Sequence, residues 1–173
     1  MPYAGQLDAP ALERLYIRLE KPLYNVVYRW VWDAGEATDI VQETFVRLWS
    51  MRGRVRLETV DSLAYKIALN LASKRKRAQK TWGWTPFEGW MGRSNLAGAD
   101  EALAANERER AVRAAVDALP DHLRAVVMLC TYSDMSYGEV ALALDIPAGT
   151  VGSRKNKAVE QLRAALEVQE WTL

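Results

Sequence analysis

The sequence has little of the chemistry on which most enzymes depend. Its 173 residues include one cysteine, Cys130, and one histidine, His122. These two side chains cannot build a disulfide framework, a zinc site with three or four nitrogen or sulfur ligands, or a histidine-based catalytic pair with a spare. The sequence also lacks a phosphate-cradling glycine loop. We therefore expect a protein that is not an enzyme and that holds no metal.

Long apolar runs are missing as well. No stretch approaches the roughly 18 to 20 apolar residues needed to span a bilayer, and residues 1–6 lack the charged-then-apolar order of a signal peptide. Yet 50% of the residues are hydrophobic, which is enough to bury a core at this length. The sequence thus predicts a cytoplasmic protein without membrane insertion.

The net charge of +1 hides an uneven distribution. Residues 1–65 carry a net charge of −1, residues 66–98 carry +6, and residues 99–173 carry −4. The positive charge is concentrated in the run KRKR at 74–77. Such a run indicates a polyanionic partner, although clusters of this size also occur at solvated helix ends.

A segment near the middle of the chain is punctuated by glycine, proline and serine and has no helical period. It predicts a flexible linker at 81–104 between two small domains, at 1–80 and 105–173. Both flanks are rich in Ala, Leu, Glu and Arg, so the predicted fold class is all-α. We expect the linker to dock on a protein surface because solvated linkers rarely carry large aromatics. Its aromatics include Trp82, Trp84 and Trp90.

An amphipathic helix is predicted over residues 36–49, because apolar residues recur at spacings of three and four while polar residues fall on the opposite face. The apolar positions are Ile40, Val41, Phe45, Leu48 and Trp49. The polar positions are Asp39, Gln42, Glu43 and Arg47. Periodicity alone favours a solvated outer face without a specific role.

A second helix is predicted over residues 61–76, ending in the basic run. Its expected buried positions are Leu63, Ala64, Ile67, Ala68 and Leu71. The preceding loop adds a second positive patch, made of Arg52, Arg54 and Arg56. Trp49 and Tyr65 lie nearby in the sequence, and positive charge beside aromatic rings is what single-stranded nucleic acid needs.

Residues 119–163 predict a helix-turn-helix. Ser136 and Glu139 have the spacing of a capping box, which satisfies the free amides at a helix start. Asp145 tolerates the left-handed backbone of a tight turn, and a further helix is expected to open near Ala148. Several agreeing signals favour DNA binding over a plain structural hairpin.

The outward face of that last helix carries short polar side chains near its start, which suits entry into the major groove. The expected inward positions are Val151, Ala158, Val159 and Leu162. Asn156 is a candidate for pairing with adenine, and Lys157 for pairing with guanine. Thr150, Arg154 and Lys155 are better placed for phosphates, which position a protein without reading sequence.

Taken together, the chain resembles a bacterial RNA polymerase sigma factor of the extracytoplasmic-function (ECF) group. The run DIVQETFVRLW at 39–49 resembles the D-[LI]-V-Q-E-x-F-x-R-L-W stretch of the sigma-2 domain, and YKIALN at 65–70 is similar to Y-R-I-A-R-N. Residues 119–162, with TVGSR at 150–154, resemble sigma-4. The resemblance implies a sigma-2-like bundle and a sigma-4-like helix-turn-helix, in a subunit that binds core RNA polymerase and directs promoter recognition and melting. It also implies that the subunit requires no cofactor.

The resemblance also implies roles for particular residues. The β′ clamp helices of core polymerase would be bound by Asp39, Gln42, Glu43 and Arg47. The −10 element would be bound by Tyr65, Lys66, Asn70, Lys74, Arg75 and Arg77. The −35 element would be bound by Thr150, Gly152, Ser153, Arg154, Asn156 and Lys157. Further implied partners are the polymerase β flap, promoter DNA and an anti-sigma factor or other inhibitory protein.

Two alternatives stay open. A free-standing helix-turn-helix regulator explains residues 119–163, but it leaves the 39–49 motif without a reason and requires a dimer on a palindromic site. A sigma-like regulatory mimic or adaptor is compatible with the altered 63–74 segment, where Lys74 replaces the usual aspartate. Gly152, where a basic residue is usual, bears on which −35 sequence is read.

Overall fold

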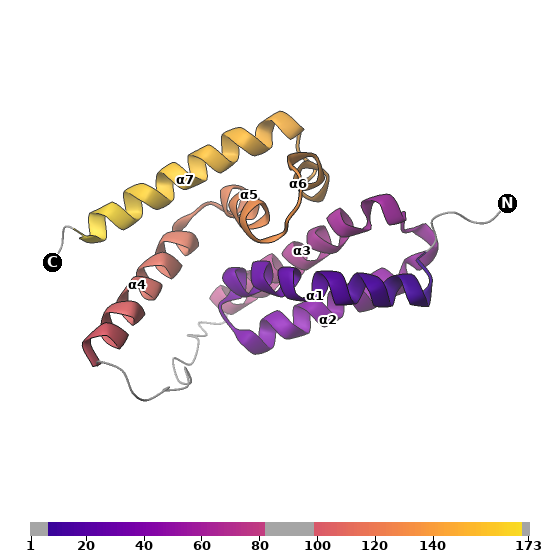
Figure 1. The fold of residues 1–173 in the computed structure, drawn as a ribbon, viewed down its shortest axis with the longest axis horizontal. Coiled ribbons are helices and arrows are strands. Elements are labelled where there is room, and N and C mark those ends of the chain that lie inside the picture. Colours follow the sequence, from indigo (N-terminus) through magenta and orange to yellow (C-terminus); the bar gives the residue numbers. More distant parts are fainter. Residues whose placement is uncertain (1–6, 82–98, 171–173) are drawn as a thin grey trace.

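The regular structure of the chain is helical throughout the part described by the computed structural model, residues 7–81 and 99–170 (Figure 1). This confirms the predicted all-α fold class. Two 3-10 turns, η1 and η2, connect the second and third α-helices. The elements are α1 (Ala9–Val31), α2 (Ala34–Ser50), η1 (Arg52–Arg54), η2 (Leu57–Thr59), α3 (Val60–Thr81), α4 (Ala99–Ala118), α5 (Asp121–Tyr132), α6 (Tyr137–Leu144) and α7 (Ala148–Glu170).

Helices α1, α2 and α3 pack on one another as a bundle. The link from α1 to α2 is short, because Trp32 adopts a left-handed conformation with φ 57° and the carboxylate of Asp33 caps α2 by accepting from the Glu36 amide at 2.8 Å. The helix predicted at 36–49 is thus confirmed. Of its apolar positions, Ile40, Val41, Phe45 and Leu48 are buried, whereas Trp49 is 37% exposed.

Helices α4 to α7 form the second unit, which contains the helix-turn-helix. The predicted capping box is present, with the Ser136 hydroxyl accepting from the Glu139 amide and the Glu139 carboxylate accepting from the Ser136 amide. Asp145 ends α6 in the left-handed conformation, with φ 56°. Helix α7 begins at Ala148, as predicted, and α5 supplies a buried strip of apolar side chains beneath it.

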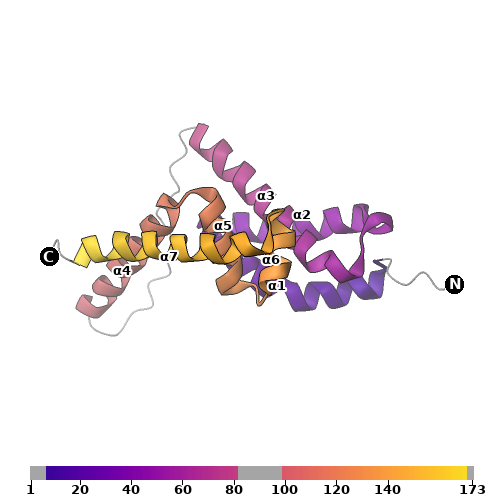
Figure 2. The same cartoon turned by 90° about the horizontal axis from the view of Figure 1, so that it is seen from above.

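The two units pack directly against each other, which the sequence did not predict. Helix α6 lies on α3, and α5 lies on α1. The Ser62 hydroxyl of α3 donates to the Glu139 carbonyl of α6 at 3.0 Å, and the indole Nε1 of Trp32 donates to Asp117 of α4 at 3.1 Å. One hydrophobic core therefore runs through both units. The C-terminal part of α3 extends beyond this packed body (Figure 2).

The predicted domain limits at 1–80, 81–104 and 105–173 stay a prediction. Helix α4 begins at Ala99, so the last part of the expected linker is helical. Trp82, Trp84 and Trp90 lie outside the described residues, and so does their expected docking.

The described residues contain neither a membrane-spanning helix nor a metal-binding cluster. In residues 7–81 and 99–170 we find no helix with the length and apolar character that a bilayer crossing demands. Over the same ranges, no group of three or more His, Cys, Asp or Glu side chains is arranged to hold a metal ion.

Candidate protein and nucleic-acid interfaces

The polar face of α2 is open to solvent along much of its length. Asp39 and Gln42 are exposed, and Arg47 donates to Glu43 one turn earlier, with Nη2 2.7 Å from Oε1. Hydrogen bonds from Arg47, and then from Arg75, lower the pKa of Glu43. The four residues predicted to bind polymerase therefore share one surface, which carries charged and amide groups ready for a protein partner.

An apolar groove lies beside this polar face, and the sequence reasoning missed it. Its lining includes Leu12 and Tyr16 from α1, and Phe45 and Trp49 from α2. Val46 of α2 is also exposed, at 66%. Val46 does not line the groove; the sequence marks it only as an apolar residue within the motif but outside the predicted apolar positions. The surface of α2 thus offers a partner both charge and apolar area.

The basic run of α3 is divided among three environments. Lys74 and Arg77 are exposed, as the DNA-binding prediction requires. Arg75 instead turns toward α2, with Nη1 2.6 Å from Glu36 and Nη2 3.2 Å from Glu43. Lys76 pairs with Asp117 of α4 and donates to a backbone carbonyl of α1. In this structure Arg75 is therefore paired with α2, and its assignment to the −10 element stays a prediction.

Two further candidates for the −10 element are not free in this conformation, because one is buried and the other pairs with the second unit. Tyr65 is 0% exposed, so its ring is not accessible in this conformation, and its assignment to the −10 element stays a prediction. Burial, followed by the charges of Asp61 and Asp134, raises its pKa. Lys66 pairs with Asp145 at the turn of the helix-turn-helix, with Nζ 2.7 Å from Oδ2. Asn70 is exposed.

Helix α7 presents most of its predicted DNA-binding residues to solvent. Ser153, Asn156 and Lys157 are exposed, while Thr150, Gly152 and Arg154 are half-buried. Of the inward positions, Val151 and Ala158 are buried, but Val159 is 38% exposed. A Cβ at Gly152 would lie 3.6 Å from the Tyr137 ring, an ordinary contact, so packing does not by itself require glycine there.

Loss of the capping box should weaken the unit that holds α7. We expect Ser136→Ala to lower the free energy of unfolding by about 1 kcal/mol, because an amide at the start of α6 loses its acceptor. Ser136 also lowers the pKa of Glu139, so the contribution should be present at neutral pH and lost as the pH falls through that pKa. Urea unfolding at several pH values measures this. Ser153→Ala, at an exposed helical position, is the matched control and should change stability less.

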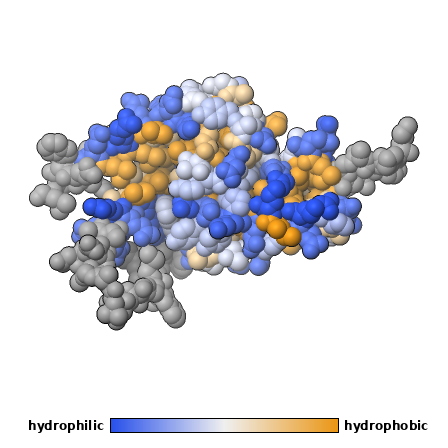
Figure 3. Space-filling view, in the orientation of Figure 1, coloured by the Kyte–Doolittle hydropathy of each residue, from blue (hydrophilic) through white to orange (hydrophobic). Residues whose placement is uncertain are grey.

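An apolar patch lies on the second unit, over α4 and α7 (Figure 3). Exposed apolar residues on these helices include Val112, at 45%, and Val159. Neither residue was predicted to be functional. Val159 stands out only because it was predicted to face inward and is exposed instead. A patch of this kind suits a protein partner more than a nucleic acid.

Comparison with known protein families accounts for both halves of the chain. Residues 15–81 match the family model "Sigma-70 region 2", and residues 109–162 match "Sigma-70, region 4". The first match contains the 39–49 motif, which a free-standing regulator leaves unexplained. The two matches together cover more than half of the chain, which belongs to the sigma-70 family of sigma factors.

Individual relatives place the chain more closely. It is 28% identical to the RNA polymerase sigma-H factor of Pseudomonas aeruginosa, over 92% of this chain and 88% of the relative. It is also 28% identical to the ECF RNA polymerase sigma-E factor of Escherichia coli K12, over 90% of this chain and 86% of the relative. The chain is therefore of the ECF type, a non-enzymatic sigma factor that acts with RNA polymerase in transcription initiation.

Two solved structures share the fold. One is CnrH in complex with the cytosolic domain of CnrY, with a TM-score of 0.70 and 21% identity over 93% of this chain and 90% of that one. The other is the sigma factor RpoE in complex with the anti-sigma factor NepR from Bartonella quintana, with a TM-score of 0.66 and 19% identity over 90% of this chain and 96% of that one.

Proposed function

We propose that this sigma factor binds the β′ clamp helices of core RNA polymerase through the polar face of α2. The carrying observation is that Asp39, Gln42, Glu43 and Arg47 form one accessible surface on a helix whose opposite face is buried. The apolar groove lined by Trp49 adds apolar area to the same surface, and this area would lose its water when the partner binds. Protein interfaces combine such an apolar centre with a polar rim. The patch on α4 and α7 is the proposed contact for the β flap.

We place promoter recognition on α3 and α7. Lys74, Asn70 and Arg77 are accessible for the −10 element, and Ser153, Asn156 and Lys157 for the −35 element. Tyr65 and Lys66 join the −10 surface once the second unit moves away. Thr150, Gly152 and Arg154 flank the reading face of α7.

Simultaneous use of both surfaces requires the two units to separate. Elements centred about 25 base pairs apart lie roughly 85 Å apart along B-DNA, at about 3.4 Å per base pair. In the present structure, Lys66 and Asp145 join α3 directly to the turn before α7. The closed arrangement is therefore the free state in this proposal, and the polymerase-bound state is extended.

The proposal places the protein in the cytoplasm, where bacterial RNA polymerase works. It also includes an anti-sigma factor or another inhibitory protein as a partner. The similarity in fold to a sigma factor in complex with the anti-sigma factor NepR supports this partner, as do the exposed apolar surfaces on both units. The domain division at 1–80 and 105–173 belongs to the same proposal.

Reconstitution tests the proposal. Purified protein added to bacterial core polymerase should produce transcription from a defined set of genomic start sites, each preceded by a shared pair of upstream elements. Core polymerase alone supplies the baseline. A dimer that binds a palindrome without polymerase, and produces no start sites with it, would contradict the proposal and support a free-standing regulator.

A further inference from the structure

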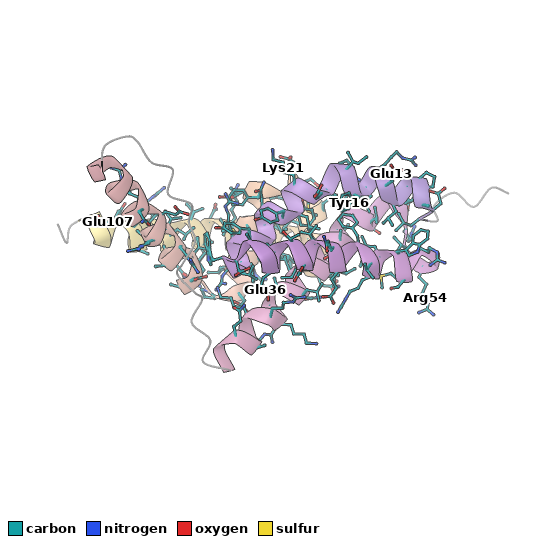
Figure 4. All side chains as sticks on the ribbon, turned by 90° about the horizontal axis from the view of Figure 1, so that it is seen from below. Glu13, Tyr16, Lys21, Glu36, Arg54 and Glu107 are labelled. Atoms are coloured by element: carbon teal, nitrogen blue, oxygen red, sulfur yellow. The ribbon has the colours of Figure 1, made fainter. Side chains whose placement is uncertain are left out.

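Arg75 belongs to the basic run of α3, yet its guanidinium group pairs with acidic side chains of another helix. Its side chain is 31% exposed, and it lies 2.6 Å from Glu36, 3.2 Å from Glu43 and 4.0 Å from Asp39. All three acidic residues belong to α2, and they share one face because three or four residues separate each from the next. In Figure 4, Glu36 lies on α2, on the side from which the end of α3 extends.

The charges on this face of α2 need such a partner. Like charges three or four residues apart on a helix repel each other, and Asp39 and Glu43 both belong to the surface that binds polymerase. One guanidinium group in reach of all three offsets that repulsion. Its planar fork fits two carboxylates at once, as the contacts to Glu36 and Glu43 show, whereas an ammonium group is a single point charge.

The contact also fixes where the carboxylate of Glu43 points. Glu43 accepts from Arg47 through Oε1 and from Arg75 through Oε2, so both of its oxygens are held. A carboxylate held by two arginines presents a set geometry to an incoming protein and loses less conformational freedom when it binds. Glu36 also accepts a hydrogen bond from Arg75, but it was not part of the predicted interface.

We propose that Arg75 is a positioning residue for core-polymerase binding and not a −10 DNA contact. It orders the acidic residues of α2, while Lys74 and Arg77 of the same run are exposed. The basic run therefore serves two interfaces, with its members divided between protein and DNA. This inference rests on the proposed binding of polymerase through α2.

The neighbouring residue Lys74 provides a matched control, because it lies on the same helix, carries the same charge and is exposed. We expect Arg75→Gln to weaken the affinity for bacterial core polymerase roughly tenfold. The salt dependence of promoter binding by the assembled holoenzyme should stay unchanged. Lys74→Gln should leave the affinity for core polymerase unchanged and reduce the salt slope by about one. Arg75→Lys keeps the charge but loses the fork, so its affinity should fall between those of the wild type and Arg75→Gln.

A double-mutant cycle separates positioning from a general loss of stability. Glu43→Gln and Arg75→Gln should together weaken core binding by less than the product of their separate effects, because each removes the same ordered contact. Circular dichroism checks folding, and if Arg75→Gln does not fold, the cycle is made with Arg75→Lys.

Three results would overturn the inference. These are unchanged core affinity in the Arg75 variants, fully multiplicative effects in the cycle, and a salt slope that falls in Arg75→Gln as it does in Lys74→Gln. If the wild-type protein binds core polymerase while one of these results is obtained, the positioning role alone is wrong. If the wild-type protein does not bind at all, the proposed function fails and this inference fails with it.

Discussion

Treatment of the free protein with a carbodiimide is expected to reduce promoter-dependent transcription at least tenfold. This reagent joins a lysine to a carboxylate only where the two are in contact, and two such ion pairs bridge α3 to the second unit. They are Lys66 with Asp145, at 2.7 Å, and Lys76 with Asp117. An amide at either pair would hold the molecule closed, so that two elements roughly 85 Å apart on DNA cannot both be reached. Runoff transcription with the isolated cross-linked monomer measures the loss.

The matched control for this experiment is the variant Lys66→Arg/Lys76→Arg. Arginine keeps both charges but does not form the amide, while every carboxylate remains open to the reagent. The treated control should therefore retain transcription. Mass spectrometry of the joined peptides identifies the bond. Full activity of a monomer joined at Lys66 and Asp145 would show that the units need not separate, and the account of promoter recognition would be wrong.

Trp30→Ala should be the most damaging single substitution among the tryptophans of the described residues. Trp30 is 2% exposed, and the guanidinium carbon of Arg124 lies 4.8 Å from its ring centroid, so the ring joins the α1 bundle to α5. Its removal leaves a cavity at the junction of both units, and we expect the free energy of unfolding to fall by about 3–5 kcal/mol. Urea unfolding followed by circular dichroism measures this without relying on tryptophan emission.

Trp49→Ala is the control for that substitution, because Trp49 is 37% exposed and lies at the surface, with the guanidinium carbon of Arg52 4.4 Å from its ring centroid. An exposed cation–π pair contributes about 0.5–1 kcal/mol. The loss of stability should therefore be several times smaller than for Trp30→Ala. Equal losses from the two variants would mean that the junction between the units contributes little to the fold.

Sequence reasoning succeeded where a few neighbouring residues decide the outcome. The capping box of Ser136 and Glu139 and the left-handed turn at Asp145 depend on side chains and backbone within one turn of the chain. The amphipathic period likewise located α2 and its polar face. The family resemblance then supplied function, because the same polar face has no assigned role on periodicity alone.

Sequence reasoning failed where distant contacts decide. The run at 74–77 looks uniform, but Arg75 reaches α2 and Lys76 reaches α4, since tertiary packing rather than composition selects their partners. Tyr65 is fully buried, which no local pattern reports. The turn at Trp32 was also not predicted. A bulky residue with φ 57° is rare, and no sequence pattern indicates it.

The affinity of the α2 surface for core polymerase tests the central claim most directly. The measurement is equilibrium binding of fluorescently labelled protein to bacterial core polymerase, comparing the wild type with Asp39→Ala/Gln42→Ala. Both of these side chains are exposed, so the variant should fold normally, and we expect it to bind at least tenfold more weakly. Ser153→Ala/Asn156→Ala on α7 should bind core polymerase as the wild type does but lose promoter recognition. Equal affinity of the wild type and the α2 variant would contradict the account.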